Sequence, residues 1–218
     1  MLIFLPMAAL WLAGRRQLAT ALAFTLAATV VIAPWTVRNV RHYGRFVLIA
    51  SEGGVTFWTG NHPRARGEGD LAANPELKRE EIVFRAAHPG LSAEELEPLY
   101  YRDALQHIRN NPGGWIGLLI RKAFYTIVPI GPSYTLHSTK YLLASVVPYG
   151  VLAPLAIAGF IVIRRSGQPP EALYLLAASV VLTSLIFFPQ ERFRLPVIDP
   201  LIIIGAAPAV GAASRKHP

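Results

Sequence analysis

The sequence contains no cysteine, which excludes disulfide bonds, thiolate metal sites and cysteine nucleophiles. It is also poor in charge: charged residues make up 16% of its 218 residues, whereas a soluble domain carries about 25%. Hydrophobic residues make up 53%, and the mean hydropathy is +0.38. A chain of this composition has too few charged side chains to cover a water-facing surface, so we expect an integral membrane protein.

Recognisable chemical motifs are absent as well. The histidines show neither an HExxH motif nor another metal-ligand spacing, so we expect no metal site. There is no phosphate-binding glycine-rich loop and no nucleophile elbow. No cofactor is evident, and the sequence leaves a requirement for a divalent ion open. The six histidines are His42, His62, His88, His107, His137 and His217.

Basic residues exceed acidic ones, with 21 Lys and Arg against 13 Asp and Glu, for a formal charge of +8. In a soluble protein this excess would suggest nucleic-acid binding. Here the basic residues border apolar runs, which favours membrane topology and anionic lipid head groups. We therefore expect the lipid bilayer as a partner and no nucleic acid.

Five apolar segments predict an all-α, polytopic bundle of transmembrane helices. Two lie within residues 1–35, and the first of them, 1–13, is shorter than the ~20 residues that cross a bilayer, so it resembles a truncated span. Residues 36–140 form a large polar loop. Three more spans are expected within 141–213, followed by a short tail at 214–218. The segments are 1–13, 18–35, 141–163, 172–188 and 195–213.

Pairs of basic residues predict the orientation, because Lys and Arg in short connections mark the cytoplasmic side. These pairs fall at alternate ends of the spans and agree with a single topology. The tail and two short connections are then cytoplasmic, while the 36–140 loop and the 189–194 turn face the exterior together. The pairs are Arg15 and Arg16, Arg164 and Arg165, and Arg215 and Lys216.

Within the loop, helix-start signals predict two amphipathic helices. Asn74 followed by Pro75 is typical of a helix beginning, and Ser92 with Glu95 forms a capping box. The second helix should end before Pro112 and bury one face. That face comprises Leu96, Tyr100, Ala104 and Ile108.

A third stretch, 114–128, is apolar apart from Arg121 and Lys122. Its charge disfavours a span and fits a helix lying in the membrane interface, with the basic pair directed toward phosphates. A helix packed against the loop's own core is an equal alternative.

The turn before the last span carries Glu191, Arg192 and Arg194. Guanidinium groups bind phosphate in a bidentate manner, so we interpret this turn as a lipid-phosphate site at head-group depth. The alternative is interfacial anchoring with a local ion pair between Glu191 and Arg194. Asp199 lies just inside the next span and needs a partner there, for which Arg194 and Arg192 are the candidates.

A second group of candidates follows the second span. Arg38 and Asn39 lie directly after it, and Trp58 and Asn61 lie further along in a glycine-rich stretch. An indole face and an amide are groups that commonly hold sugars. Ordinary turn chemistry would explain the same residues.

Together these segments resemble the C-terminal part of the GT-C class of polytopic, lipid-linked-sugar-dependent glycosyltransferases, and within it the bacterial protein-mannosyltransferase-like group of family 39. The order of the matching pieces, with spans between them, carries the resemblance over nearly the whole chain. The pieces are PWTVRNVRHYGRFVLIASEGGVTFWTGNHP at 34–63, YYRDALQHIRNNPGGWIGLLIRKAFYTI at 100–127 and ERFRLPVIDPLIIIGAA at 191–207.

This resemblance implies transfer of a sugar from a polyprenyl-phosphate donor to an envelope glycan, lipid or protein on the outer face of the bacterial inner membrane. It would place Arg192 and Arg194 near the lipid phosphate, with Arg38 and Asn39 lining the same cavity. In the family an acidic residue after the first span activates the acceptor. No acid occurs in 1–35, so the catalytic residue is unknown, and we expect a fragment or one piece of a split enzyme that is inactive alone.

Two other functions compete with this one. The chain could be a non-catalytic accessory or scaffold subunit of an envelope-assembly complex, and a partner chain would then supply the chemistry. A small transporter is disfavoured, because the spans carry almost no ionisable residue apart from Asp199.

Overall fold

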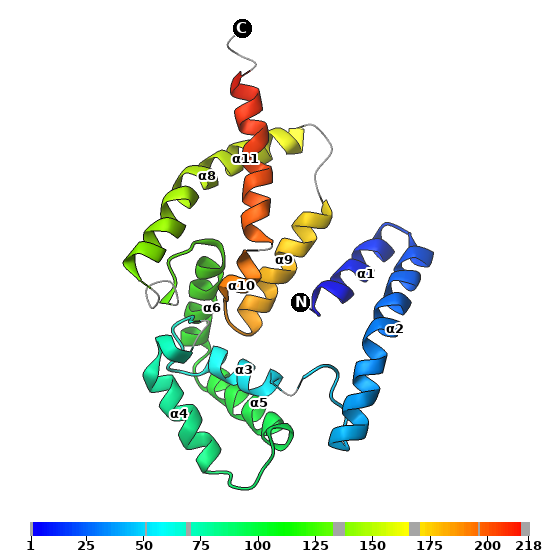
Figure 1. Ribbon diagram of the computed structural model, residues 1–218, viewed down its shortest axis with the longest axis vertical. Coiled ribbons are helices and arrows are strands. Elements are labelled where there is room, and N and C mark those ends of the chain that lie inside the picture. Colours follow the sequence, from blue (N-terminus) through cyan, green and yellow to red (C-terminus); the bar gives the residue numbers. More distant parts are fainter. Residues whose placement is uncertain are drawn as a thin grey trace.

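The structure, a computed structural model, describes residues 2–50, 52–68, 71–132, 138–165, 171–195 and 197–214. Within these ranges all regular secondary structure is helical and there is no strand (Figure 1), which confirms the all-α class. The helices are α1 (Phe4–Gly14), α2 (Leu18–Tyr43), α3 (Gly53–Asn61), η1 (Leu71–Ala73), α4 (Pro75–Ala86), α5 (Ala93–Asn110), α6 (Pro112–Ile127), α8 (Thr139–Arg165), α9 (Glu171–Ile186), α10 (Glu191–Arg194) and α11 (Ile198–Ser214).

Helices α3 to α6 form a unit with a core of its own, at the bottom of Figure 1. The predicted starts of two of these helices are confirmed. The Asn74 side chain accepts a hydrogen bond from the Leu77 N–H at 3.1 Å, and Ser92 and Glu95 form the capping box of α5. Each pairing satisfies N–H groups that a helix start leaves free. The buried residues of the core are Trp58, Ala65, Leu77, Leu96, Tyr100, Ala104 and Leu118.

The glycine-rich stretch forms a helix, α3, where the sequence suggested tight turns. Two of its glycines are explained by close approach of the backbone. A Cβ on Gly54 would lie 2.5 Å from the Glu97 carbonyl oxygen of α5, and a Cβ on Gly60 would lie 1.8 Å from the Phe187 oxygen beyond α9. Glycine thus lets α3 pack directly against two neighbours, and this packing outweighs its low helix propensity.

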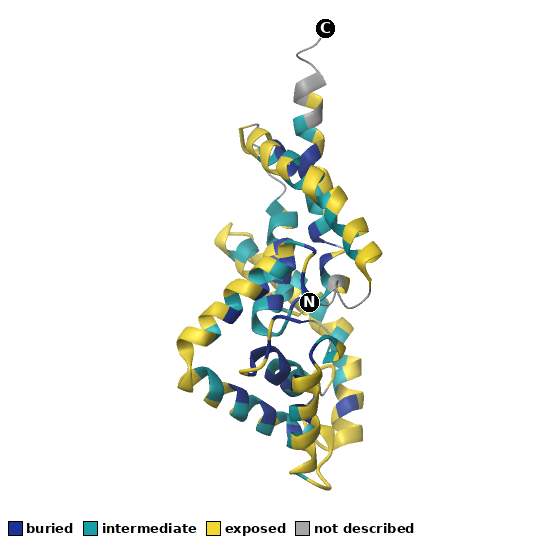
Figure 2. Cartoon of the chain, turned by 90° about the vertical axis from the view of Figure 1, so that its left-hand side faces the viewer, coloured by how far each residue is buried: buried dark blue, intermediate teal, exposed yellow. Residues whose placement is uncertain are grey.

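Two helices, α2 and α8, are long and apolar enough to cross a membrane, which suggests that the protein associates with one. Three apolar helices are shorter: α1, α9 and the first part of α11. Both long helices leave most of their surface uncovered, and Figure 2 shows the buried residues gathered toward the middle of the molecule while the outer helices are largely exposed. Apolar surface of this extent is unfavourable in water.

The five apolar helices do not close into the single bundle that the sequence suggested. They form an open row of pairwise contacts, in which α1 packs on α2 and on α9, while α11 packs on α9 and most extensively on α8. The two long helices therefore lie on opposite sides of Figure 1. The α8–α11 contact is tight because Gly159 and Gly205 face each other; a Cβ on Gly159 would lie 1.6 Å from the Gly205 oxygen.

Helix α2 runs past Pro34, where the sequence suggested the end of the span, and continues to Tyr43. It ends at Gly44, whose backbone is left-handed with φ 67° and whose N–H bonds the Val40 carbonyl. A proline removes one helical hydrogen bond but does not end a helix whose later residues remain favourable. The polar continuation from Arg38 onward therefore belongs to the helix and not to the loop.

Candidate functional site

The turn before α11 is built by the short helix α10. The Phe193 and Arg194 N–H groups both bond the Gln190 carbonyl, at 3.0 and 3.3 Å, and the Arg194 carbonyl accepts from the Val197 N–H at 3.1 Å. This tight winding turns Arg194 inward, where its side chain is 6% exposed. Its Nη2 lies 2.8 Å from Oδ1 of Asp199, which confirms the expected pairing and identifies Arg194 as the partner.

A cavity of about 260 Å³ opens beside this ion pair, between α8 and α11. The guanidinium of Arg194 also lies over the Tyr149 ring of α8, 5.0 Å from its centroid, and this contact fixes the polar end of the cavity. The remaining walls are mostly aliphatic. The residues lining the cavity are Tyr141, Ala144, Ser145, Pro148, Tyr149, Leu152, Arg194, Leu195, Asp199, Ile202 and Ile203.

The two arginines of the turn are placed differently. Arg192 is exposed, donates from Nε to the Gln190 side-chain oxygen at 2.5 Å, and lies 5.2 Å from the centroid of the Phe193 ring. Among the described side chains no carboxylate neutralises it. The Glu191 side chain, and with it the suggested Glu191–Arg194 pair, lies outside the described part of the chain. Arg192 does not line the cavity; it lies exposed on α10, two positions before Arg194, with no carboxylate partner among the described side chains.

Asn61, a predicted sugar ligand, joins three helices instead. Its Nδ2 donates to the carbonyls of Phe57 and Ile186, both at 2.8 Å, and its Oδ1 accepts from Trp115 Nε1 at 2.9 Å and from Lys122 Nζ at 3.2 Å. The amide is 4% exposed, and these four bonds use its whole hydrogen-bonding capacity. Asn61 thus ties α3 to α6 and to the end of α9.

The basic pair of α6 is divided, which corrects the expectation that both charges face phosphates. Arg121 is exposed, whereas Lys122 is wholly buried and donates to Asn61 and, at 3.0 Å, to the Leu185 carbonyl. Burial in surroundings that favour the neutral amine lowers the Lys122 pKa from 10.5 to about 7. Helix α6 therefore packs its polar lysine inward.

The opposite face of α6 is apolar and exposed. The exposed fraction of its side chains is 54% for Ile116, 67% for Ile120, 49% for Phe124 and 45% for Ile127. This spacing of four, four and three residues places them in one stripe along the helix. The alternative that this helix packs against the protein is confirmed for one face, and the interfacial interpretation of the other, exposed face stays a prediction.

The remaining candidates belong to the framework. Trp58 is 2% exposed and donates from its indole N–H to Asp103 at 2.6 Å, so its ring offers no open face to a sugar. Asn39 is buried and bonds the Val47 and Ile49 carbonyls, which closes the turn after α2. Arg38 stacks on Trp35 at 4.8 Å. Figure 1 shows this end of α2 far from α10, so Arg38 and Asn39 do not line a cavity with Arg192 and Arg194.

Sequence reasoning overlooked Tyr149, because it lies on α8, 45 positions before Arg194, and no local pattern links the two. Over the described ranges, no group of three potential ligands could hold a metal ion. No family model, no curated protein and no solved structure matches the chain.

Proposed function

We propose that this chain is a multi-pass membrane protein that binds the phosphate of a polyprenyl-linked sugar between α8 and α11, as a module of a membrane glycosyltransferase. The cavity beside the Arg194–Asp199 pair is the observation that carries this proposal. A polyprenyl phosphate is a long apolar chain with one anionic end, and the cavity has mostly aliphatic walls with the Arg194 guanidinium, paired with Asp199, at one end. Bidentate hydrogen bonding makes arginine suited to that anion.

Arg192 and Arg194 have different roles in this proposal. Arg194 is held by Asp199 and Tyr149, so it shapes the polar end of the cavity and supplies little net charge. Arg192 does not line the cavity but lies exposed on the same short helix, two positions before Arg194, and in this proposal it contacts the phosphate where the head group leaves the cavity. Because Arg192 is exposed, its site suits a head group at the membrane surface.

Several features support placement of the chain in a bilayer. The five apolar helices act as membrane segments, with α2 and α8 of spanning length and α6 laid in the interface by its exposed apolar stripe. Arg15, in the α1–α2 turn, pairs with Glu171 at the start of α9, so this turn and the start of α9, both proposed to be cytoplasmic, contact each other. In Figure 1 these ends and the C-terminal ends of α8 and α11 lie above the α3–α6 unit. The unit then faces the periplasm of a bacterial inner membrane.

Sugar transfer would also need a carboxylate to activate the acceptor hydroxyl. In family 39, which the sequence resembles, that residue lies in a loop that none of the three resembling pieces covers. We therefore assign donor binding to Arg192, Arg194 and the α8–α11 cavity, and leave catalysis to a segment or partner that supplies the acid. The sugar and the acceptor are not specified by this site.

Binding of undecaprenyl phosphate to the purified chain in nanodiscs, measured by native mass spectrometry, tests the proposal. We expect Arg192→Gln to reduce the bound fraction at least tenfold, because it removes the available charge. Arg194→Lys keeps the charge but removes the planar guanidinium that Asp199 and Tyr149 hold, so it should disturb the polar end of the cavity and weaken binding to a smaller extent.

A matched control removes charge from the other end of α8. Arg164 and Arg165 are both exposed, and their double replacement by Gln should leave binding unchanged. Equal loss in this control and in Arg192→Gln would show nonspecific attraction of an anionic lipid and would overturn the site. Undiminished binding in both arginine variants of the turn would do so too.

A further inference from the structure

A second, larger cavity lies inside the α3–α6 unit, away from the α8–α11 site. It has a volume of about 390 Å³, within the range typical of small-molecule sites. Two glycines of α6, Gly114 and Gly117, border it, and a Cβ on Gly117 would meet nothing within 4 Å. The other lining residues are Asn61, His62, Pro63, Ala65, His107, Ile108, Asn111, Trp115, Leu118 and Arg121.

The hydrogen-bond acceptors on the side chains of this lining are largely occupied. The Asn61 oxygen accepts from Trp115 and Lys122, and the Asn111 oxygen accepts from the Gly114 N–H at 2.9 Å. Nδ1 of His62 accepts from the Arg64 N–H at 3.2 Å. These three acceptors are therefore not available to a ligand.

Donors, in contrast, remain available. Because Nδ1 of His62 accepts, the neutral ring carries its hydrogen on Nε2, and burial keeps the ring neutral by lowering its pKa to about 4. Within the described chain, that Nε2, the Asn111 amide nitrogen and the Arg121 guanidinium have no partner. No carboxylate lines the cavity, and the nearby Asp103 is engaged by Trp58 and His107.

Trp115 adds an aromatic wall to this set of donors. Its indole N–H is bonded to Asn61 at 2.9 Å, which fixes the orientation of the ring. A fixed indole beside amide and imidazole donors is the combination that binds the C–H face and the oxygens of a sugar ring.

From these contacts we propose that the α3–α6 cavity binds a sugar that carries an oxyanion, either a phosphate or a carboxylate. Arg121 binds the oxyanion at the rim, His62 and Asn111 donate to oxygens of the ligand, and the ring lies against Trp115. This site is separate from the lipid-phosphate site between α8 and α11 and does not depend on it.

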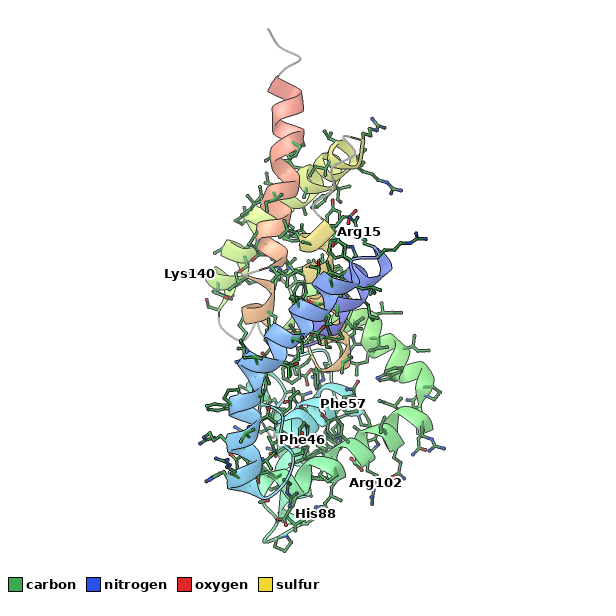
Figure 3. The ribbon with its side chains drawn as sticks, turned by 90° about the vertical axis from the view of Figure 1, so that its right-hand side faces the viewer. Arg15, Phe46, Phe57, His88, Arg102 and Lys140 are labelled. Atoms are coloured by element: carbon green, nitrogen blue, oxygen red, sulfur yellow. The ribbon has the colours of Figure 1, made fainter. Side chains whose placement is uncertain are left out.

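Isothermal titration calorimetry of the full chain in detergent micelles, with glucose 1-phosphate as the probe, tests this site. Saturable binding is expected, weaker by at least tenfold in Arg121→Gln, which removes an exposed side chain and leaves the fold intact. Arg102 provides the matched control: it is an exposed arginine of α5, labelled on the surface in Figure 3, and Arg102→Gln should bind like the wild type.

A second pair of variants tests the cavity without changing charge. Gly117→Leu should fill the space and abolish binding, whereas Gly113→Leu, on the same helix but outside the cavity, should not. Absence of saturable binding in the wild type, or equal effects within either pair, would overturn the proposal.

Three further ligands define what is recognised. Glucose and inorganic phosphate should each bind much more weakly than glucose 1-phosphate, because glucose lacks the oxyanion and inorganic phosphate lacks the sugar ring. Equally tight binding of either would overturn the sugar-oxyanion assignment. Glucuronate presents a carboxylate in place of the phosphate, and the tighter of the two anionic sugars identifies the oxyanion.

Discussion

Replacement of Lys122 by Met should change how the stability of the protein depends on pH. Lys122 is fully buried, and its pKa is lowered from 10.5 to about 7 by burial. Between these values the unfolded chain binds a proton that the folded chain does not. Stability therefore rises as pH increases from 7 to 10.5 and is lost as pH falls through the same window.

The size of this effect follows from the shift. Each pH unit inside the window contributes up to ~1.4 kcal/mol, so the wild type should gain ~4 kcal/mol between pH 7 and pH 10 from this one group. Met has a similar shape and no titrating group, so Lys122→Met should lack that gain. It also loses two hydrogen bonds, to Asn61 and Leu185, worth about 1 kcal/mol each, and this loss does not depend on pH.

The assay is urea unfolding of the chain in detergent micelles, followed by circular dichroism at pH 7, 8, 9 and 10. The quantity of interest is the difference in unfolding free energy between wild type and Lys122→Met, which should move by ~4 kcal/mol in favour of the wild type. Lys78→Met, at an exposed position of α4, should give a difference that is constant with pH. If the difference in unfolding free energy between wild type and Lys122→Met were also constant with pH, the conclusion that Lys122 is buried and neutral would be refuted.

Three other predictions concern packing and protonation. Gly159→Ala should separate α8 from α11 and lower the thermal midpoint of unfolding in detergent, because its Cβ would lie 1.6 Å from the Gly205 oxygen. Gly150→Ala, in open space on the same helix, should not lower the midpoint, and equal midpoints for the two variants would contradict the close contact. Asn61→Leu should lower the free energy of unfolding by ~3 kcal/mol or more in urea titrations, because it leaves the Trp115 and Lys122 donors buried without their acceptor. A change below ~1 kcal/mol would mean that these donors bond other acceptors. Burial lowers the His62 pKa from 6.5 to about 4, so the free energy of unfolding should fall as pH drops from 6.5 toward 4. In the same urea titrations His62→Gln should remove up to ~3 kcal/mol of that fall, and the same fall in the variant as in the wild type would contradict the lowered pKa.

The features that the sequence predicted well are local ones. The Asn74 cap and the Ser92–Glu95 capping box depend on residues three apart, so their signal is complete within one helical turn. The pairing of Asp199 with an arginine of the turn was also predictable, since Arg194 and Asp199 lie only five positions apart. The apolar runs were likewise visible because span length is a property of one segment.

The misplaced residues depend on contacts between distant segments. Lys122 seemed to point to lipid phosphates because α6 is otherwise apolar, and only the Leu185 carbonyl and Asn61 make its inward position favourable. Trp58 lies in the core because Asp103 accepts its N–H from 45 residues away. No local pattern reports such partners, and the open row of apolar helices is also a matter of long-range packing.

The central claim is that a polyprenyl phosphate binds between α8 and α11, and cysteine protection tests it most directly. Because the chain has no cysteine, a single introduced cysteine is labelled alone. Ser145→Cys lies in the cavity, whereas Gly150→Cys lies on the same helix outside it. Undecaprenyl phosphate in nanodiscs should slow maleimide labelling of Ser145→Cys and leave Gly150→Cys unaffected; equal labelling rates at Ser145→Cys with and without the lipid would contradict the site.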